Sequence, residues 1–424
     1  MSIYEYFKHF KEISFHMPGH KGRIPVPVVD VTELSGTDNL RCPEGIIKEA
    51  EEQMAKQLDK QAAFFLTNGA SSGILAGILA TTKVNETVLV DRNCHVSVLN
   101  GLILSGAVPK FIYPKMNTEF GIPYSVLADD ISYHGEKTVI VTSPTYYGEV
   151  SDMTAIRETV GDALLLQDES HGAHFYFCDA LKACRTKQSD LTVLSFHKTM
   201  PTLNQGAILA MNSQRIAGQK VKDAINMVTT TSPSYPILSS LDYSGMYGKE
   251  LYKNDEILSE ICALKSWLET ETPLRVLEND DPYKLLINCD FSNLTAADIQ
   301  KELEQKYSVY IEGVFANNLL LMFSPCNTSE EIATLRQAFS NLTLIQSEPI
   351  QQFQIPILRL HQALSPREAY FAEGELVFKQ QAVGRISKEN ITKFPPCVPI
   401  VTIGEMITEE AVSLLEKDFV EVVK

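Results

Sequence analysis

The sequence predicts an α/β fold in which a large domain with a mostly parallel sheet is followed by a smaller α+β C-terminal domain. Apolar runs rich in Val, Ile and Leu recur through the first half of the chain without polar alternation, as is typical of strands covered on both faces. Stretches that can form helices separate several of these runs, and such alternation favours a parallel sheet between helical layers. The predicted strands are 62–66, 87–90, 138–143, 163–168, 191–196 and 206–210.

The helices are predicted from caps and breakers. Residues 151–160 open with Ser and Asp, both good N-caps, and a long helix is predicted over 246–270, ended by the following Thr-Pro. Residues 295–307 and 328–339 open with Thr-x-x-Asp and Thr-x-x-Glu, which predicts two more helices. Two further strands are predicted at 283–290 and 319–324.

The chain therefore divides into four predicted regions. The last of them is rich in short apolar runs and proline turns, which predicts an added lobe. The regions are an N-terminal arm (1–50), a cofactor-binding large domain (51–245), a small α+β domain (246–345) and a C-terminal accessory lobe (346–424).

Composition excludes several classes of protein. The 424 residues contain 37 Lys and Arg against 53 Asp and Glu, and the net charge of −16 argues against nucleic acid as a partner. The longest apolar stretch, 73–80, is far shorter than the roughly 20 residues of a membrane helix, and residues 1–15 lack the apolar core of a signal peptide. The eight cysteines form no C-x-x-C pair, so we expect reduced thiols and a cytoplasmic protein. They are Cys42, Cys94, Cys178, Cys184, Cys262, Cys289, Cys326 and Cys397.

Polar residues that follow the predicted strands are the candidates for chemistry, because open parallel sheets bind ligands beyond the carboxyl ends of their strands. A metal site is not predicted, since His171 and His174 lack a clear third ligand. A serine hydrolase is not predicted either, because the chain has no G-x-S-x-G motif. The candidate segments are "TNGASSG" (67–73), "DRNCH" (91–95), "PTYYGEV" (144–150), "DESHGAHF" (168–175) and "SFHK" (195–198).

Pyridoxal 5'-phosphate is a cofactor that uses this whole set. The Gly/Ser turn at 67–73 provides backbone N–H groups at a helix start, which can hold a phosphate. Asp168, at a strand end, can pair with the ring nitrogen and keep it protonated. Lys198, about thirty residues later, can form a Schiff base with the aldehyde. A role in binding the cofactor explains why Lys198 lies between two apolar runs.

Several motifs, in order along nearly the whole chain, resemble those of the fold-type I Orn/Lys/Arg decarboxylase family. The resemblance is to the short bacterial form, which lacks the N-terminal wing domain of the long enzymes. It implies a fold-type I large domain and a pyridoxal-phosphate cofactor. The motifs are "FHMPGHKGR" (15–23), "TDNLRCPEGII" (37–47), "VDRNCHVSV" (90–98), "TSPTYYGEVSD" (142–152), "DESHGAHF" (168–175), "SFHKTMPTLNQGA" (195–207), "SPREAYF" (365–371), "AVGRIS" (382–387) and "FPPCVPIVTIGEMITEE" (394–410).

The resemblance also implies roles for individual residues. Lys198 carries the cofactor and Asp168 binds its ring nitrogen. His171 lies near the ring hydroxyl, and His95 stacks on the ring face. His174 is expected to be a packed structural residue. The other residues assigned to the cofactor are Ala70, Ser71, Ser195 and His197 at the phosphate, and Thr145 beside the ring.

The expected reaction is loss of CO2 from a basic amino acid, arginine before lysine or ornithine, to give an amine of polyamine metabolism. Lys198 or His197 donates the proton to the α carbon. Glu405 and Asp38 are candidates to meet the distal cation of the substrate. The alternatives are an aminotransferase or other fold-type I enzyme, and a non-catalytic paralogue.

The remaining expectations concern assembly and two departures from the family pattern. We expect a homodimer or a larger even-numbered assembly, with the arm around 16–23 reaching across to the partner. Ser170 stands where the family usually has Ala, a change the site should tolerate. Ile403 stands where Pro commonly precedes the Gly-Glu pair, which affects substrate details rather than cofactor chemistry.

Overall fold

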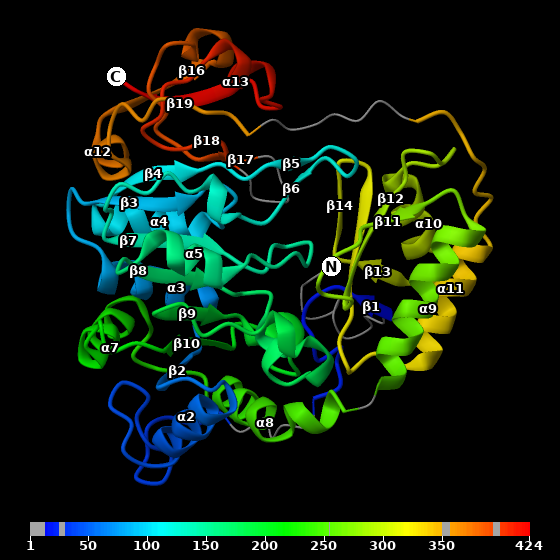
Figure 1. The fold of residues 1–424 in the computed structure, drawn as a ribbon, viewed down its shortest axis with the longest axis horizontal. Helices are drawn as coiled ribbons and strands as arrows, with labels where there is room; N and C mark the ends of the chain where they lie inside the picture. The colour runs from blue at the N-terminus through cyan, green and yellow to red at the C-terminus, as the bar shows by residue number, and fades with distance from the viewer. Residues whose placement is uncertain (1–12, 25–29, 254, 350–356, 393–398) are drawn as a thin grey trace.

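The structure, a computed structural model, is shown in Figure 1. It places an antiparallel sheet with its helices beside the large domain, and a C-terminal lobe over the β3–β4 edge of the large sheet. The residues described are 13–24, 30–253, 255–349, 357–392 and 399–424. Predictions for Cys397, for residues 1–12 and for the proline-rich turn at 393–398 lie outside them.

A seven-stranded sheet forms the centre of the large domain, in the order β2-β10-β9-β8-β7-β3-β4. β10 runs antiparallel to both of its neighbours, and the remaining pairings are parallel. The mostly parallel sheet is confirmed, and each of the six predicted runs contains a strand. The strands are β2 (Ala62–Leu66), β3 (Thr87–Asp91), β4 (Val108–Ile112), β7 (Thr138–Thr142), β8 (Leu164–Asp168), β9 (Leu191–Leu194) and β10 (Ala207–Met211).

β4 is the strand that the sequence pattern missed. It lies at the edge of the sheet and contains Pro109 and Lys110, which interrupt the apolar run. An edge strand tolerates proline and lysine because one of its sides makes no ladder hydrogen bonds.

Helices cover both faces of this sheet. Successive β8 residues point to opposite faces: Leu165 packs with Ile156 of α5, whereas Leu166 packs with Ile74 of α3. This burial on both faces explains the continuous apolar runs. Asp152 caps α5, as predicted, by accepting from the amides of the next turn. The helices are α2 (Ile46–Gln57), α3 (Gly69–Thr81), α4 (Val96–Ser105), α5 (Met153–Val160), α6 (Phe196–Thr199) and α7 (Gly218–Val228), with short 3-10 turns at Ala128–Asp130, Ala173–Tyr176 and Asp179–Cys184.

The second sheet is antiparallel, in the order β11-β12-β15-β14, and its helices lie on one side of it (Figure 1). The predicted capping boxes are present: Thr295 with Asp298 and Thr328 with Glu331. The elements are β11 (Arg275–Val276), β12 (Lys284–Asn288), β13 (Val309–Ile311), β14 (Gly313–Phe315), β15 (Asn318–Met322), α9 (Asp255–Glu271), α10 (Ala296–Tyr307) and α11 (Ser329–Ser340).

The single long helix predicted over 246–270 is wrong. The chain instead forms α8 (Tyr235–Leu251) and then α9, with Tyr252 capping the first. Tyr252 is buried, and its hydroxyl donates to the backbone oxygen of Thr199 at 2.9 Å. Tyr252 thus ties the end of α8 to the large domain through a contact that local helix propensity does not encode.

Residues 13–24 lie against their own chain. β1 (Ile13–Phe15) pairs in parallel with β13, and the two strands form a separate two-stranded sheet. A few residues later, the Gly19 amide donates to the His197 backbone oxygen at 2.7 Å, and a Cβ on Gly19 would lie 2.8 Å from the Thr199 carbonyl carbon. This segment therefore joins β13 to α6.

The C-terminal lobe contains two small antiparallel sheets, and a short hairpin lies near it in Figure 1. The lobe contacts the large domain where α12 packs on α4. The elements are β5 (Met116–Asn117) and β6 (Ile122–Pro123) of the hairpin, and α12 (Pro366–Phe371), β16 (Gly374–Phe378), β17 (Ile391–Thr392), β18 (Pro399–Val401), α13 (Glu409–Ser413) and β19 (Phe419–Val423) of the lobe, with a 3-10 turn at Lys379–Ala382.

The close packing of α3 on α4 predicts a stability effect. A Cβ on Gly101 would lie 2.5 Å from Ile78 Cδ1. Gly101→Val should lower the free energy of unfolding by about 1–3 kcal/mol, because a crowded core must shift to accept the side chain. Chemical denaturation measures this. Gly36→Val is the control, since a Cβ there meets nothing within 4 Å; equal effects at both sites would contradict the packing argument.

Candidate active site

A cavity of about 630 Å³ opens at the carboxyl ends of the central strands. Its size suits a small-molecule ligand. Every residue that the sequence assigned to the cofactor, except Thr145, lines it. Those residues are Ala70, Ser71, His95, Asp168, His171, Ser195, His197 and Lys198.

Lys198 and His171 are in direct contact. Lys198 lies on α6, and its Nζ is 2.9 Å from His171 Nε2. Burial lowers the pKa of His171 well below its usual value, and the nearby charges of Lys198 and Lys284 lower it further. His171 is therefore a neutral ring, and an ammonium on Lys198 can donate to its Nε2.

His197 is a second neutral imidazole in the cavity wall. Its Nδ1 lies 3.3 Å from both Ser195 Oγ and the backbone oxygen of Gly206. Burial, followed by the charge of Lys198, lowers the pKa of His197 to about 4. Ser195 and His197 thus present polar groups to the cavity without adding a second positive charge.

The Gly/Ser turn is the start of α3. Gly69 has φ of +79°, a conformation that other residues adopt only with strain, and its amide donates to Gln205 at 2.9 Å. The next residues, Ala70 and Ser71, lie in the first helical turn, where amide groups have no partner within the helix. Such a turn is suited to binding an anion.

His95 is the N-cap of α4. Its Nδ1 accepts from the Ser97 amide at 3.1 Å and lies 2.8 Å from Ser97 Oγ. Burial lowers its pKa, with the Lys198 charge contributing in the same direction and Asp168 opposing them. The ring is therefore neutral and fixed in orientation, with its proton on Nε2.

Asp168 ends β8 at the cavity wall. Its Oδ1 accepts from the Ser170 amide at 3.1 Å and from Ser170 Oγ at 2.5 Å. The departure from the family pattern at Ser170 thus adds a hydroxyl donor to this carboxylate. Oδ2 takes part in neither contact, which leaves it for a ligand.

Tyr146 is a cavity residue that the sequence analysis did not assign, although it lies in the "PTYYGEV" segment. Its ring packs edge-on against His171 at 5.0 Å between centroids. Its hydroxyl donates to Glu312 Oε1 at 2.6 Å, and the Met17 amide donates to Glu312 Oε2 at 3.0 Å. Nothing in the sequence indicated that Glu312 contacts Tyr146 and Met17, because these contacts depend on how β13 and β1 pack.

Thr145 and His174 are not in the cavity wall. Thr145 is buried, and its backbone oxygen accepts from Lys284 Nζ at 3.3 Å. His174 is fully buried and pairs with Asp281 at 3.0 Å. Burial lowers the pKa of Lys284 to about 7, although Asp281 opposes this shift. Of these groups, Lys284 acts on the cavity through its charge, which lowers the pKa of His171.

Neither candidate for the distal cation of the substrate lines the cavity. Glu405 is fully buried and makes a bidentate ion pair with Arg92, at 2.6 and 2.9 Å. Desolvation is the largest single effect on Asp38 and raises its pKa, but hydrogen bonds from four backbone amides together outweigh it and lower the pKa to about 2.

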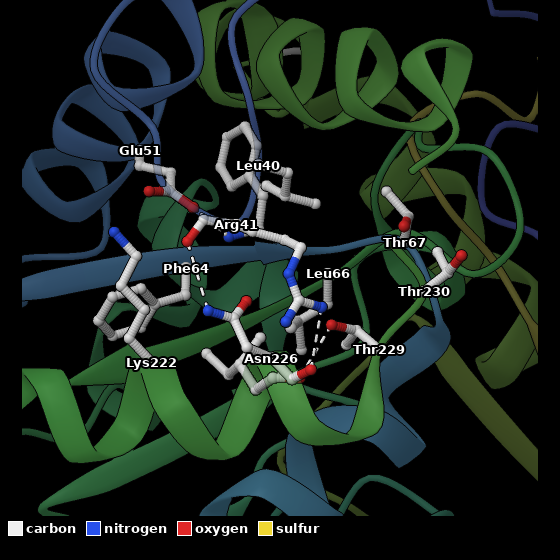
Figure 2. A pocket seen from close by; sticks show the side chains of 12 residues that line it. Leu40, Arg41, Glu51, Phe64, Leu66, Thr67, Lys222, Asn226, Thr229 and Thr230 are labelled. Carbon is white, nitrogen blue, oxygen red and sulfur yellow. Dashed lines mark hydrogen bonds between the residues drawn. The ribbon is translucent and has the colours of Figure 1, made fainter. Parts of the chain in front are cut away.

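A second, much smaller cavity lies between the segment at 40–41 and α7 (Figure 2). Arg41 and Asn226 exchange hydrogen bonds there, at 3.0 and 3.4 Å. Burial raises the pKa of Glu51, in the same wall, to about 7. At about 20 Å³ the space holds roughly one water molecule, so it is not a substrate site.

Two features are absent from the described part of the chain. No group of three His, Cys, Asp or Glu side chains there is arranged to hold a metal ion. Within the same residues, none of the helices has the length and apolar character needed to cross a membrane.

The sheet order and the lysine-containing cavity define a fold-type I pyridoxal-phosphate enzyme fold. Residues 25–278 match the family model described as "Orn/Lys/Arg decarboxylase, major domain". The chain belongs to the Orn/Lys/Arg decarboxylase family.

Relatives cover nearly the whole chain. The arginine decarboxylase of Bacillus subtilis is 30% identical, over 96% of this chain and 90% of that protein. The arginine decarboxylase of Halalkalibacterium halodurans is also 30% identical, with the same coverage. The crystal structure of the lysine decarboxylase of Francisella novicida superimposes with a TM-score of 0.78 at 17% identity, over 91% of this chain and 73% of that one. That likeness shows the fold.

The neutral state of His197 predicts a pH dependence of stability. Its pKa is about 4 in the folded protein and about 6.5 when unfolded, so the unfolded chain binds more protons between these values. Above pH 6.5 the His197 ring therefore does not change the free energy of unfolding. As the pH falls toward 4, it lowers the free energy of unfolding by up to about 3 kcal/mol. His197→Gln should lose less stability than wild type between pH 7 and pH 4.5, measured by denaturation at each pH. His134→Gln, at an exposed histidine, should follow wild type; identical curves for all three proteins would contradict the assignment.

Proposed function

We propose that this protein is a pyridoxal-phosphate-dependent decarboxylase of a basic amino acid, with arginine preferred to lysine and ornithine. The observation that carries the proposal is the contact of Lys198 Nζ with a neutral His171, in a cavity that also contains Asp168 and the start of α3. Membership of the family supports the reaction. Relatives named arginine decarboxylase, which match nearly end to end, support the substrate.

The residues present fit the cofactor. His171 Nδ1 is buried without a hydrogen-bond partner among the described residues, and it carries the ring proton when Nε2 accepts from Lys198. A buried donor of this kind requires an acceptor, which an oxygen of the cofactor would supply. The carboxylate of Asp168 suits a pyridinium nitrogen. The residues that would hold the phosphate are Ala70, Ser71, Ser195 and His197.

Lys198 carries the proton chemistry of the site, and the neutral imidazoles do not donate the proton. When bound, the cofactor supplies an electron-withdrawing ring that accepts the electron pair left by departing CO2. Lys198 Nζ would hold the cofactor, and its amine would be available to carry a proton once the substrate occupies the site. The free ammonium is a stronger acid than the N–H of a neutral imidazole, so Lys198 rather than His197 donates the proton to the α carbon.

The distal cation of the substrate needs a negative partner. Asp168 is the carboxylate found among the described residues that line the cavity, and the cofactor ring requires it. Glu312 lies behind the wall, joined to it by the hydroxyl of Tyr146. We assign Glu312 as the acidic group on this side of the cavity.

We also propose that the protein works in the cytoplasm as a homodimer or larger even-numbered assembly, with no nucleic acid partner. Closed symmetric assemblies are the common form of soluble oligomers. Residues 13–24 contribute to the site within one chain, since Met17 lines the cavity. The amine product would enter polyamine biosynthesis.

Lys198→Ala should remove the covalent link to the cofactor and lower kcat by about three orders of magnitude or more, because the nucleophile and proton donor are lost together. Borohydride reduction followed by peptide mass spectrometry locates the modified lysine in the wild type. Lys83→Ala, at an exposed site away from the cavity, should behave as wild type. A cofactor adduct on another lysine would overturn the assignment of Lys198.

Arginine should be the preferred substrate, with ornithine slower by roughly a hundredfold or more. A site that pairs a guanidinium through two hydrogen bonds leaves a buried carboxylate unpaired when the substrate is shorter. The measurement is kcat/KM for arginine, lysine and ornithine under identical conditions, with the amine identified. Lysine or ornithine ahead of arginine would overturn the preference. A keto acid product in place of an amine would indicate an aminotransferase, and turnover of none of the three would favour a non-catalytic paralogue.

A further inference from the structure

The ion pair between Arg92 and Glu405 joins the C-terminal lobe to the large domain. Both side chains are 0% exposed, and two oxygens of Glu405 meet two nitrogens of Arg92 at 2.6 and 2.9 Å. A buried ion pair of this kind is weak as a source of stability, because desolvation of the two charges offsets much of their attraction. A role in holding geometry accounts better for its presence.

We propose that Glu405 is a positioning residue for the active site: through Arg92 it fixes the 91–95 loop, and thereby the orientation of His95 in the cavity. This inference rests on the proposed function, since it assigns His95 to the cofactor. If it is correct, the C-terminal lobe influences the active site of the large domain through the Arg92–Glu405 ion pair.

Arg92 is held from several directions at the end of β3. Its amide donates to the Ile112 backbone oxygen of β4 at 2.9 Å. Its guanidinium lies 4.5 Å from the centre of the Phe111 ring, and Nη2 also donates to the Ile400 oxygen of the lobe at 3.2 Å. These contacts therefore fix the position of the Arg92 side chain, and the Glu405 carboxylate supplies the charge that holds it there.

The path from Arg92 to the cavity is short. Asn93, Cys94 and His95 follow directly, and all three line the cavity. The Asn93 amide donates to Asp91 Oδ1 at 2.8 Å, and His95 then caps α4. Because the loop is anchored at both ends, a displacement of Arg92 must move the intervening residues.

The turn that carries Glu405 is shaped to present its carboxylate. Gly404 has φ of +89°, and a Cβ there would lie 2.3 Å from the Leu364 oxygen. Only glycine fits this position without displacing the backbone. The Thr402 amide donates to Glu405 Oε2 at 2.7 Å and orients the carboxylate toward Arg92.

The lobe has a second attachment that does not involve Glu405. α12 packs on α4, and Arg367 Nη1 donates to the Leu104 oxygen at 2.9 Å. Loss of the Glu405 contact can therefore be tested without releasing the lobe. The lobe also offers a matched control in the partly exposed pair of Glu375 with Arg385, at 2.7 Å.

The test compares Glu405→Gln with Glu375→Gln in the full chain. Hydrogen exchange of the apoprotein, followed by mass spectrometry, should show faster exchange by about tenfold in peptides covering 92–99 for Glu405→Gln alone. Affinity for pyridoxal 5'-phosphate, measured by titration of the apoprotein, should fall about tenfold to a hundredfold, as for supporting partners of ligand-binding groups. Glu405→Asp should recover part of this loss.

A double-mutant cycle separates positioning from a structural role. If Glu405 acts through His95, then Glu405→Gln should weaken cofactor binding little further in a His95→Ala background. If Glu405→Gln fails to fold, the paired change Arg92→Met with Glu405→Met replaces both charges by apolar groups and carries the same expectations.

Unchanged exchange across 92–99, or fully additive effects in the cycle, would overturn the inference. A wild-type protein that binds no pyridoxal 5'-phosphate would overturn the proposed function instead, while the exchange comparison would still decide whether Glu405 fixes the loop.

Discussion

The neutral state of the imidazoles around Lys198 is the constraint on which the site depends. Burial is the main cause, and the positive charge of Lys198 adds to it for both His171 and His197. A charged imidazole 2.9 Å from an ammonium would be strongly unfavourable in a poorly solvated cavity. The cavity therefore concentrates its positive charge on Lys198 and gives Asp168 the balancing negative charge.

The order of the sheet produces this arrangement. β8 ends at Asp168 and β9 ends just before α6, and because the two strands are parallel neighbours their carboxyl ends meet at one edge. β10 then returns antiparallel to β9, which places Gly206 where its oxygen meets His197 Nδ1 at 3.3 Å. The reversal of strand direction at β10 thus brings a backbone oxygen next to His197.

Much of the large domain could be predicted from sequence because its strands are buried on both faces and read as continuous apolar runs. What could not be predicted depends on contacts between distant residues. The end of α8 depends on buried Tyr252, and the burial of Glu405 depends on Arg92, 313 positions earlier. Tyr146 takes the place in the cavity wall that its neighbour Thr145 was expected to hold, because the direction of a side chain in an irregular segment is set by packing.

Lys284 and Asp281 also affect the protonation state of His171. Lys284 is buried, and its charge, like that of Lys198, disfavours protonation of His171. Asp281 lies 4.0 Å from Lys284 Nζ and 3.0 Å from His174 Nε2, so it offsets part of the Lys284 charge. His171 Nε2 therefore contacts one cation, Lys198, while the charge of a second, Lys284, is partly neutralised by Asp281. Under these charges the ring can act only as a neutral hydrogen-bonding group, accepting at Nε2 and donating at Nδ1, which is the state that a cofactor oxygen requires.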